Sequence, residues 1–213
     1  MPQEIEILTL GLKPYAEVWE LQRKLQKQLI AGETREHLLI CEHYPVITLG
    51  TSAKTHNVLA DQSVLQQQGV ELFKIERGGD VTYHGPGQLV AYPILNLNIR
   101  KRDIGWYLRS LEQSVINCLS DFGLASQGIC GKTGVWLSPE KKICSIGVRI
   151  SRWCTMHGLA LNVTEQSLKG FSLINPCGFT DIEVTCMQKE LQGRQFSIGE
   201  VSSRFCHHFG QIF

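Results

Sequence analysis

The sequence predicts an α+β fold in which helices cover a mixed or antiparallel sheet. Three segments repeat apolar residues at helical spacing, near the beginning, the middle and the end of the chain. Between these segments lie short runs typical of strands. Several of the runs are separated from the next by turn residues alone, which favours hairpins over regular βαβ alternation. The chain of 213 residues fits one domain, 1–213, with a substantial core.

The three predicted helices have recognisable ends. The first spans 14–32, with proline at its start and glycine at its end, and the second spans 103–123, with Asp103 as the capping residue. The third spans 197–212 and begins at Ser197. Each helix has one apolar face, which predicts packing against a core.

Nine runs rich in β-branched and aromatic residues predict strands. They are 5–10, 37–41, 46–49, 70–76, 81–83, 89–97, 134–137, 143–150 and 156–163. Turn residues between them predict three connections. These are a two-residue hairpin loop at Gly78-Gly79 that joins 70–76 to 81–83, a second turn at 85–87, and a hairpin tip at 138–141.

Composition narrows the classes of function. The net charge of +1 and the pI near 7.6 argue against a nucleic-acid-binding protein. No apolar run is long enough to cross a bilayer, and the first residues lack the features of a secretory signal, so the expected compartment is the cytoplasm. The eight cysteines are widely spaced without a Cys-x-x-Cys, which predicts reduced thiols, most of them buried, and no metal site.

The segment 77–88, Arg-Gly-Gly-Asp-Val-Thr-Tyr-His-Gly-Pro-Gly-Gln, is the strongest candidate for binding. Its four glycines are explained by turns as well as by a ligand that approaches the backbone. Turns do not explain Arg77, Thr82, Tyr83 and His84, because a simple turn more usually contains Asn, Asp or Ser. A phosphate loop fits poorly, since no Gly-Lys-Ser/Thr ending follows.

Three further segments can carry chemistry, and each also has a purely structural explanation. The lysine pair that begins 141–149 can be the charged end of a hairpin, and the small residues Gly158 and Ala160 can admit either a ligand or a neighbouring helix. Cys177 lies between proline and glycine, which places a thiol on a stiff turn. A nearby cation would raise its thiolate fraction, but an ordinary loop cysteine is the alternative.

In order and spacing, these motifs resemble those of lipoyl(octanoyl) transferases. The motifs are 77–88, Lys-Ile-Cys-Ser-Ile-Gly at 142–147, His-Gly-Leu-Ala-Leu-Asn at 157–162 and Asn-Pro-Cys-Gly at 175–178, and Glu-His-Tyr-Pro at 42–45 extends the resemblance toward the N-terminus. The family's enzymes move an octanoyl group from acyl carrier protein to a lysine of a lipoyl domain. The resemblance implies a fold similar to the catalytic domain of biotin and lipoate protein ligases. The segment 164–171 varies in that family.

The resemblance also implies roles for particular residues. Cys177 would be the nucleophile that carries the acyl group as a thioester, and Lys142 would be its proton-transfer partner. The residues that would line the acyl pocket are Arg77, Gly78, Gly79, Asp80, Val81, Thr82, Tyr83, His84, Ser145, Ile146, Gly147, Gly158, Leu159 and Ala160. No cofactor is implied. The implied partners are octanoyl-acyl carrier protein as donor, and lipoyl domains of 2-oxoacid dehydrogenase complexes and the glycine cleavage H protein as acceptors.

Carrier proteins are acidic, so a basic docking rim is expected. By charge alone its candidates are Arg100, Lys101, Arg102, Lys141, Arg149 and Arg152, although such runs are usually a solvated face.

Two other functions compete with acyl transfer. One is an ATP-dependent lipoate or biotin ligase, which shares the implied fold but has no need of Cys177 and often has an added C-terminal domain. The other is an acyl-binding protein without catalysis, in which Cys177 is incidental.

Overall fold

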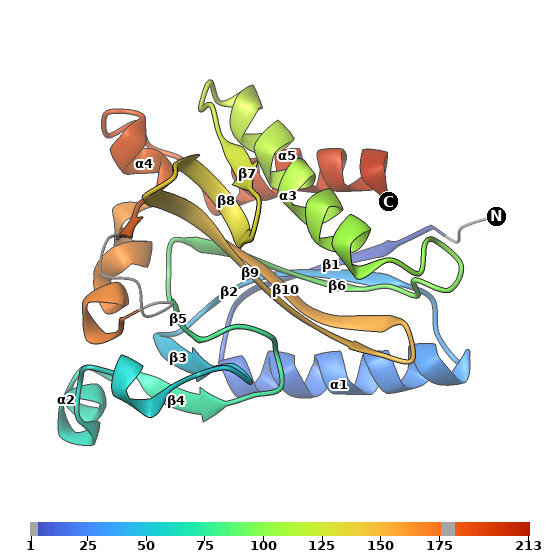
Figure 1. Ribbon diagram of the computed structural model, residues 1–213, viewed down its shortest axis with the longest axis horizontal. Coiled ribbons are helices and arrows are strands. Elements are labelled where there is room, and N and C mark those ends of the chain that lie inside the picture. The colour runs from blue at the N-terminus through green and yellow to red at the C-terminus, as the bar shows by residue number, and fades with distance from the viewer. Residues whose placement is uncertain (1–3, 176–181) are drawn as a thin grey trace.

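The structure, a computed structural model, describes residues 4–175 and 182–213. Among these residues eight strands form one large mixed sheet, shown in Figure 1. In spatial order they are β1 (Glu6–Lys13), β2 (His37–His43), β6 (Gln88–Ile94), β10 (Cys154–Asn162), β9 (Lys141–Ser151), β8 (Lys132–Ser138) and β7 (Gln127–Ile129), with β11 (Glu183–Val184) also paired to β9. β1 and β2 are parallel, as are β9 and β11, whereas the other pairs are antiparallel.

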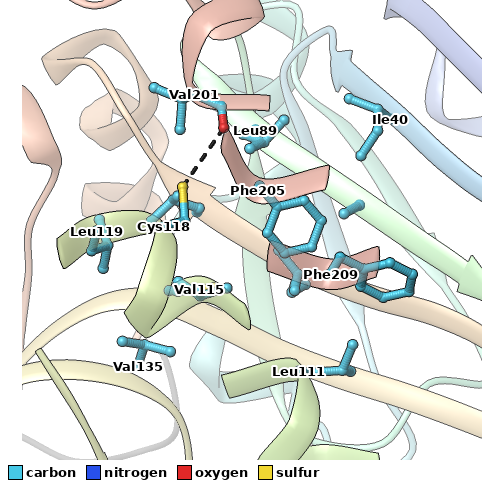
Figure 2. Close-up of a cluster of buried hydrophobic side chains, with 14 of the residues drawn as sticks. Ile40, Leu89, Leu111, Val115, Cys118, Leu119, Val135, Val201, Phe205 and Phe209 are labelled. Carbon is cyan, nitrogen blue, oxygen red and sulfur yellow. Dashed lines mark hydrogen bonds between the residues drawn. The ribbon is translucent and has the colours of Figure 1, made fainter. Parts of the chain in front are cut away.

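Helices cover both faces of the large sheet, which confirms the predicted α+β class. α3 (Ile104–Asp121) and α5 (Ile198–Ile212) pack on one face, and α1 (Tyr15–Ala31) lies along the other (Figure 1). A large hydrophobic cluster fills the core under α3 and α5, and Figure 2 shows Val115, Phe205 and Phe209 within it. The buried Cys118 thiol lies in this core, where its Sγ is 3.7 Å from the carbonyl oxygen of Val201.

The predicted helix ends are confirmed by their hydrogen bonds. Gly32 ends α1 in the left-handed conformation, at φ +75°, which glycine adopts without strain. The Asp103 carboxylate accepts from the backbone N–H of Trp106, 2.9 Å away, at the start of α3. The Ser197 hydroxyl accepts from the backbone N–H of Glu200, 3.1 Å away, at the start of α5.

A second sheet of three strands contradicts one of the predicted hairpins. Its order is β4 (Glu71–Lys74), β3 (Val46–Leu49), β5 (Val81–His84), so β4 and β5 lie on opposite sides of β3. The backbone of 77–80 is hydrogen-bonded to 50–52, and it therefore crosses the end of β3 instead of folding back on β4. The prediction of a hairpin loop at Gly78-Gly79 was wrong, because β4 pairs with β3, which comes earlier in the chain, and not with β5.

The other turn predictions have mixed outcomes. The tip at 138–141 joins β8 to β9 as an antiparallel hairpin, as predicted. The segment 85–87 does form a turn, in which the N–H of Gln88 donates to the Gly85 carbonyl, 3.3 Å away. It leads from β5 in the small sheet to β6 in the large sheet, so it does not join two strands of a hairpin.

Several short elements were not predicted, because they are too short to show periodicity. They are α2 (Gln62–Gln67), α4 (Met187–Glu190), β7, β11, and the 3-10 helices η1 (Thr55–Asn57) and η2 (Glu165–Leu173). The 3-10 helix η2 covers most of 164–171, the segment that varies in the family. Within the described ranges, the helices are all too short or too polar to span a bilayer.

Candidate functional site

A cavity of about 230 Å³ lies between the glycine-rich segment and the paired strands β9 and β10. We call it the central cavity. It brings together residues from the motifs at 77–88, 142–147 and 157–162. Every pocket residue implied by the family resemblance lines it except Tyr83. Lys142 lines it as well. The lining residues that the sequence did not indicate are Gly131, Lys132, Thr133, Trp136, Phe171, Ile182 and Val184.

Tyr83 lies behind the wall of the central cavity. Its ring is 3% exposed and packs edge-on against Phe171, with 5.8 Å between ring centroids. Gly85 and Gly170 flank the ring so closely that a Cβ on either glycine would overlap it. Tyr83 therefore fixes the position of η2, whose Phe171 does line the cavity.

Arg77 is buried and bound to the small sheet. Its Nη2 donates to the carbonyl oxygen of Thr48 at 2.7 Å and to the hydroxyl of the same residue at 3.0 Å, while Nη1 donates to the Gly78 carbonyl at 3.1 Å. A buried guanidinium requires such partners, because its desolvation is costly. Arg77 thus holds the glycine-rich segment against β3.

Asp80 connects the glycine-rich segment to the chain just before Cys177. Its carboxylate accepts from the side-chain amide of Asn57 at 2.5 Å and from its neighbour Val81 N–H at 2.7 Å. The carbonyl oxygen of the buried Asn57 accepts from the N–H of Asn175, 2.7 Å away. One short chain of hydrogen bonds therefore links the cavity lining to Asn175.

Lys142 lies over the indole of Trp136, with Nζ 4.9 Å from the ring centroid. The β8–β9 hairpin places the two residues opposite each other. Gly134 lies beside the same lysine at φ +128°, and a Cβ there would overlap the Lys142 side chain. The indole face attracts the ammonium group, and the missing side chain at Gly134 leaves space for it.

A buried carboxylate lies behind Lys142. Glu112 of α3 is 1% exposed and accepts from the N–H of Gly134 at 2.9 Å. Burial raises the pKa of Glu112, while its bond to Gly134 and the charges of Arg109 and Lys142 oppose that rise. Glu112 therefore fixes the backbone of Gly134 next to the lysine.

Buried histidines form a polar layer between the two sheets. His84 Nδ1 is 2.8 Å from Gln88 Oε1, and His43 Nε2 is 2.8 Å from the Tyr92 hydroxyl. Desolvation lowers the pKa of His84 to about 3 and that of His43 to about 4. The same cause lowers the pKa of His157 to about 3. These imidazoles are neutral at pH 7. His84 and His43 contribute hydrogen bonds, whereas both ring nitrogens of His157 have no hydrogen-bond partner among the described residues.

Gly158 and Ala160 of β10 both line the central cavity, but they differ in what surrounds them. A Cβ on Gly158 would overlap the backbone oxygen of Ala91 on the adjacent β6. Glycine is therefore required at 158 by close packing of the strands. Ala160 has no such restriction from its backbone, and it is the better position at which to alter the cavity.

Cys177, the expected nucleophile, lies outside the described residues. Among the missed lining residues, Trp136 lies opposite Lys142 because of a register shift in the β8–β9 pairing, whereas a regular hairpin with its tip at 138–141 would place Leu137 there. Phe171, Ile182 and Val184 had no sequence signal, because they come from short elements far along the chain.

Solved structures show the fold class to which this arrangement belongs. A lipoate-protein ligase A bound with ATP matches with a TM-score of 0.77 and 19% identity, over 99% of this chain and 85% of that one. A biotin protein ligase from Aquifex aeolicus with biotin and ATP matches with a TM-score of 0.55 and 13% identity, over 97% of this chain and 69% of that one. The fold is therefore that of lipoate and biotin protein ligases, as predicted.

The chain belongs to the lipoyl protein ligase A/B catalytic domain family, whose profile matches residues 14–210. Its curated relatives include the octanoyltransferase of Solibacter usitatus, 48% identical over 96% of this chain and 90% of the relative. The octanoyltransferase of Christiangramia forsetii is 42% identical over 100% of this chain and 97% of the relative. The resemblance inferred from the sequence motifs is confirmed.

Proposed function

We propose that this chain is an octanoyltransferase that moves an octanoyl group from octanoyl-acyl carrier protein to a specific lysine of a lipoyl domain, in the cytoplasm. The acceptors are the lipoyl domains of 2-oxoacid dehydrogenase complexes and the glycine cleavage H protein. The observation that carries the proposal is the central cavity, in which the Lys142 side chain meets a slot lined by small and apolar residues of β9, β10 and the glycine-rich segment.

The first step is acyl transfer to Cys177. Its thiolate attacks the thioester carbonyl of the donor, a new thioester forms, and the carrier's thiolate leaves and takes up a proton from the Lys142 ammonium, which leaves Lys142 as a neutral amine. One thioester replaces another, so little driving force is needed. The ammonium of Lys142 stabilises the attacking thiolate in this scheme, because a nearby cation favours the charged form of a thiol.

The second step is attack by the amine of the acceptor lysine on the Cys177 thioester. An amide forms, the thiolate of Cys177 is released, and the proton lost by the amine passes to the neutral amine of Lys142. An amide is more stable than a thioester, so neither nucleotide nor cofactor is required. An acyl-enzyme intermediate predicts ping-pong kinetics.

The central cavity supplies affinity for the acyl chain. Burial of a methylene contributes roughly 0.8 kcal/mol, so an eight-carbon chain gains several kcal/mol in an apolar slot. The small residues Gly158 and Ala160 leave room for the chain, and Phe171 and Ile182 add apolar surface.

The two competing functions remain distinguishable by chemistry. An ATP-dependent ligase would activate a free fatty acid through an adenylate and would not acylate Cys177. A non-catalytic acyl-binding protein would retain the chain without forming a covalent adduct.

One experiment separates the three functions. The protein is incubated with octanoyl-acyl carrier protein without ATP, and its intact mass is measured. We expect a hydroxylamine-sensitive octanoyl adduct that Cys177→Ser does not form as a thioester. A control variant, Cys130→Ser, alters an exposed cysteine and should retain the adduct. A wild-type protein without the adduct, or an adduct that forms only with free octanoate and ATP, would overturn the proposal.

A further inference from the structure

A groove of about 480 Å³ lies between α1 and the β9–β10 hairpin, and it concentrates positive charge. We call it the basic groove. Arg23 and Lys27 of α1 line one side, and Arg149 with Arg152 lines the other. Glu76 is the one carboxylate among its described lining residues. The remaining lining residues are Gln26, Ile30 and Ser151.

The charges of the basic groove are only partly neutralised. Glu76 binds two of its cations, with Oε1 3.2 Å from Arg23 Nε and 2.8 Å from Arg149 Nη1. Both arginine side chains nevertheless remain 53% and 42% exposed, respectively. Lys27 and Arg152 are exposed and have no ion pair within the described part of the chain. The groove therefore presents excess positive charge to solvent.

The basic groove continues from the central cavity along one face of β9. Alternate residues of a strand point to the same face. Ser145 and Gly147 line the central cavity, whereas Arg149 and Ser151, next on that face, line the groove. The neighbouring residues Glu76 and Arg77 also divide between the two sites. In Figure 1 the hairpin of β9 and β10 extends to a tip beside α1.

The other basic residues expected at a docking rim are less suitable. Arg100 is 5% exposed and its guanidinium binds the buried Glu36 at 2.5 Å, so it is an internal ion pair and not part of a rim. Lys141 binds Glu190 at 3.2 Å and lies 3.9 Å from Glu183. These carboxylates neutralise it. Arg149 and Arg152 are the two expected residues that join a larger cationic surface.

We infer that the basic groove is the docking surface for the acidic acyl carrier protein that donates the octanoyl group, an inference that rests on the proposed function. The donor fits the charge of the groove at two places, since both its protein surface and the phosphodiester of its pantetheine arm are negative. The acceptor instead presents a lysine, which these cations repel. Arg149 and Lys142 are seven residues apart on the same extended strand, about 23 Å at 3.3 Å per residue, so one strand runs from the groove to the central cavity.

Charge reversal tests the docking surface. The variant Lys27→Glu/Arg152→Glu changes two groove residues that have no ion pair to break within the described part of the chain. The control Lys24→Glu/Arg204→Glu changes two exposed cations outside the groove by the same charge. Both variants are compared with the wild type using octanoyl-acyl carrier protein, and using octanoyl-pantetheine, a donor with neither protein nor phosphodiester.

We expect the groove variant to raise KM for octanoyl-acyl carrier protein at least tenfold at low salt, with little change in kcat. The increase should shrink at about 0.5 M salt, because exposed charges are screened. KM for octanoyl-pantetheine should stay within twofold, and the control variant should resemble the wild type with both donors.

Three outcomes would overturn the inference. One is a KM for the carrier protein that is unchanged, or raised equally in the control. Another is a defect confined to the second half-reaction with a lipoyl domain, which would assign the groove to the acceptor. Failure of the wild type to transfer octanoyl from either donor would overturn the proposed function itself, and the docking surface with it.

Discussion

The large sheet has two buried sides that are packed by different kinds of side chain. Under α3 and α5 the core consists mainly of apolar groups such as Val115, Phe205 and Phe209 (Figure 2), and the few buried polar side chains of α3 are Ser110, Glu112 and Ser114. Between the large and small sheets, the polar side chains of Arg77 and His84 are more than nine-tenths buried and hydrogen-bonded. The second region surrounds the central cavity.

This difference teaches which interactions specify each region. Hydrophobic burial is not directional, so many apolar residues of suitable volume can fill the first region. A buried polar group must find its particular partner, and losing that partner costs about 1–3 kcal/mol. We therefore expect changes to the hydrophobic core to act mainly on stability. Changes around the central cavity should reduce activity or selectivity, and should also reduce stability where they break a buried hydrogen bond or the close packing of strands.

The largest expected effect on the cavity side comes from Lys142→Ala. If Lys142 transfers protons, its removal should lower the rate of octanoyl transfer by roughly 10²–10⁴, as for other acid-base groups. Loss of its contact with Trp136 should cost less than about 2 kcal/mol of stability. Single-turnover assays and urea denaturation measure the two effects.

Lys132 provides the matched control for Lys142. It also lines the cavity, and its Nζ lies 5.4 Å from the same indole centroid. Lys132→Ala should lose far less activity than Lys142→Ala. Equal losses would show that charge in the cavity matters and that proton transfer is not specific to Lys142.

On the hydrophobic side, Phe205→Ala should lower the free energy of unfolding by about 3–5 kcal/mol, since it leaves a cavity in a fully buried cluster. The fraction that remains folded should transfer octanoyl at nearly the wild-type rate. Urea denaturation, together with activity normalised to the folded fraction, checks both parts. A large loss of specific activity at full folding would contradict the separation of the two regions.

Sequence reasoning succeeded where the signal is local and failed where it is not. The ends of α1, α3 and α5 follow from capping residues next to apolar stripes, and the tip at 138–141 from adjacent turn residues. The crossing of 77–80 over β3 depends on pairing with 50–52, which no neighbouring residue indicates.

The same distinction holds for the candidate site. Motif recognition found residues that the fold brings to the central cavity, although the roles of Cys177 and Lys142 stay predictions. It could not separate Tyr83, behind the wall, from the residues that line the cavity. Nor could it add Arg23 and Lys27, which join the basic groove only because α1 packs beside the β9–β10 hairpin.

The buried histidines near the central cavity predict that the free energy of unfolding depends on pH. Burial lowers the pKa of His84 and of His157 to about 3 in the folded protein, whereas an exposed histidine, as in the unfolded chain, has a pKa of 6.5. Below pH 6.5 the unfolded state therefore binds more protons, and stability falls as the pH falls. From pH 7.5 to 5.0 each such histidine should cost roughly 2 kcal/mol, at 1.36 kcal/mol per pH unit.

Urea denaturation across this pH range measures the effect. His84→Asn should reduce the slope of stability against pH, whereas the control His56→Gln, which changes an exposed histidine, should leave it unchanged. A stability that is constant from pH 7.5 to 5.0 would contradict the neutral, buried state of these imidazoles.

The smallest expected effect is a change in chain-length selectivity from Ala160→Val. The added methyl groups would occupy part of the central cavity, so the variant should lose roughly 0.8 kcal/mol, about fourfold, for each methylene that it displaces. Its kcat/KM for octanoyl relative to hexanoyl donors should fall accordingly, with little loss for hexanoyl. Gly158→Ala should instead lower stability, because its Cβ overlaps the backbone of Ala91. If Ala160→Val keeps the wild-type preference, the acyl chain does not reach the floor of the cavity at β10, and the slot that accepts it lies elsewhere.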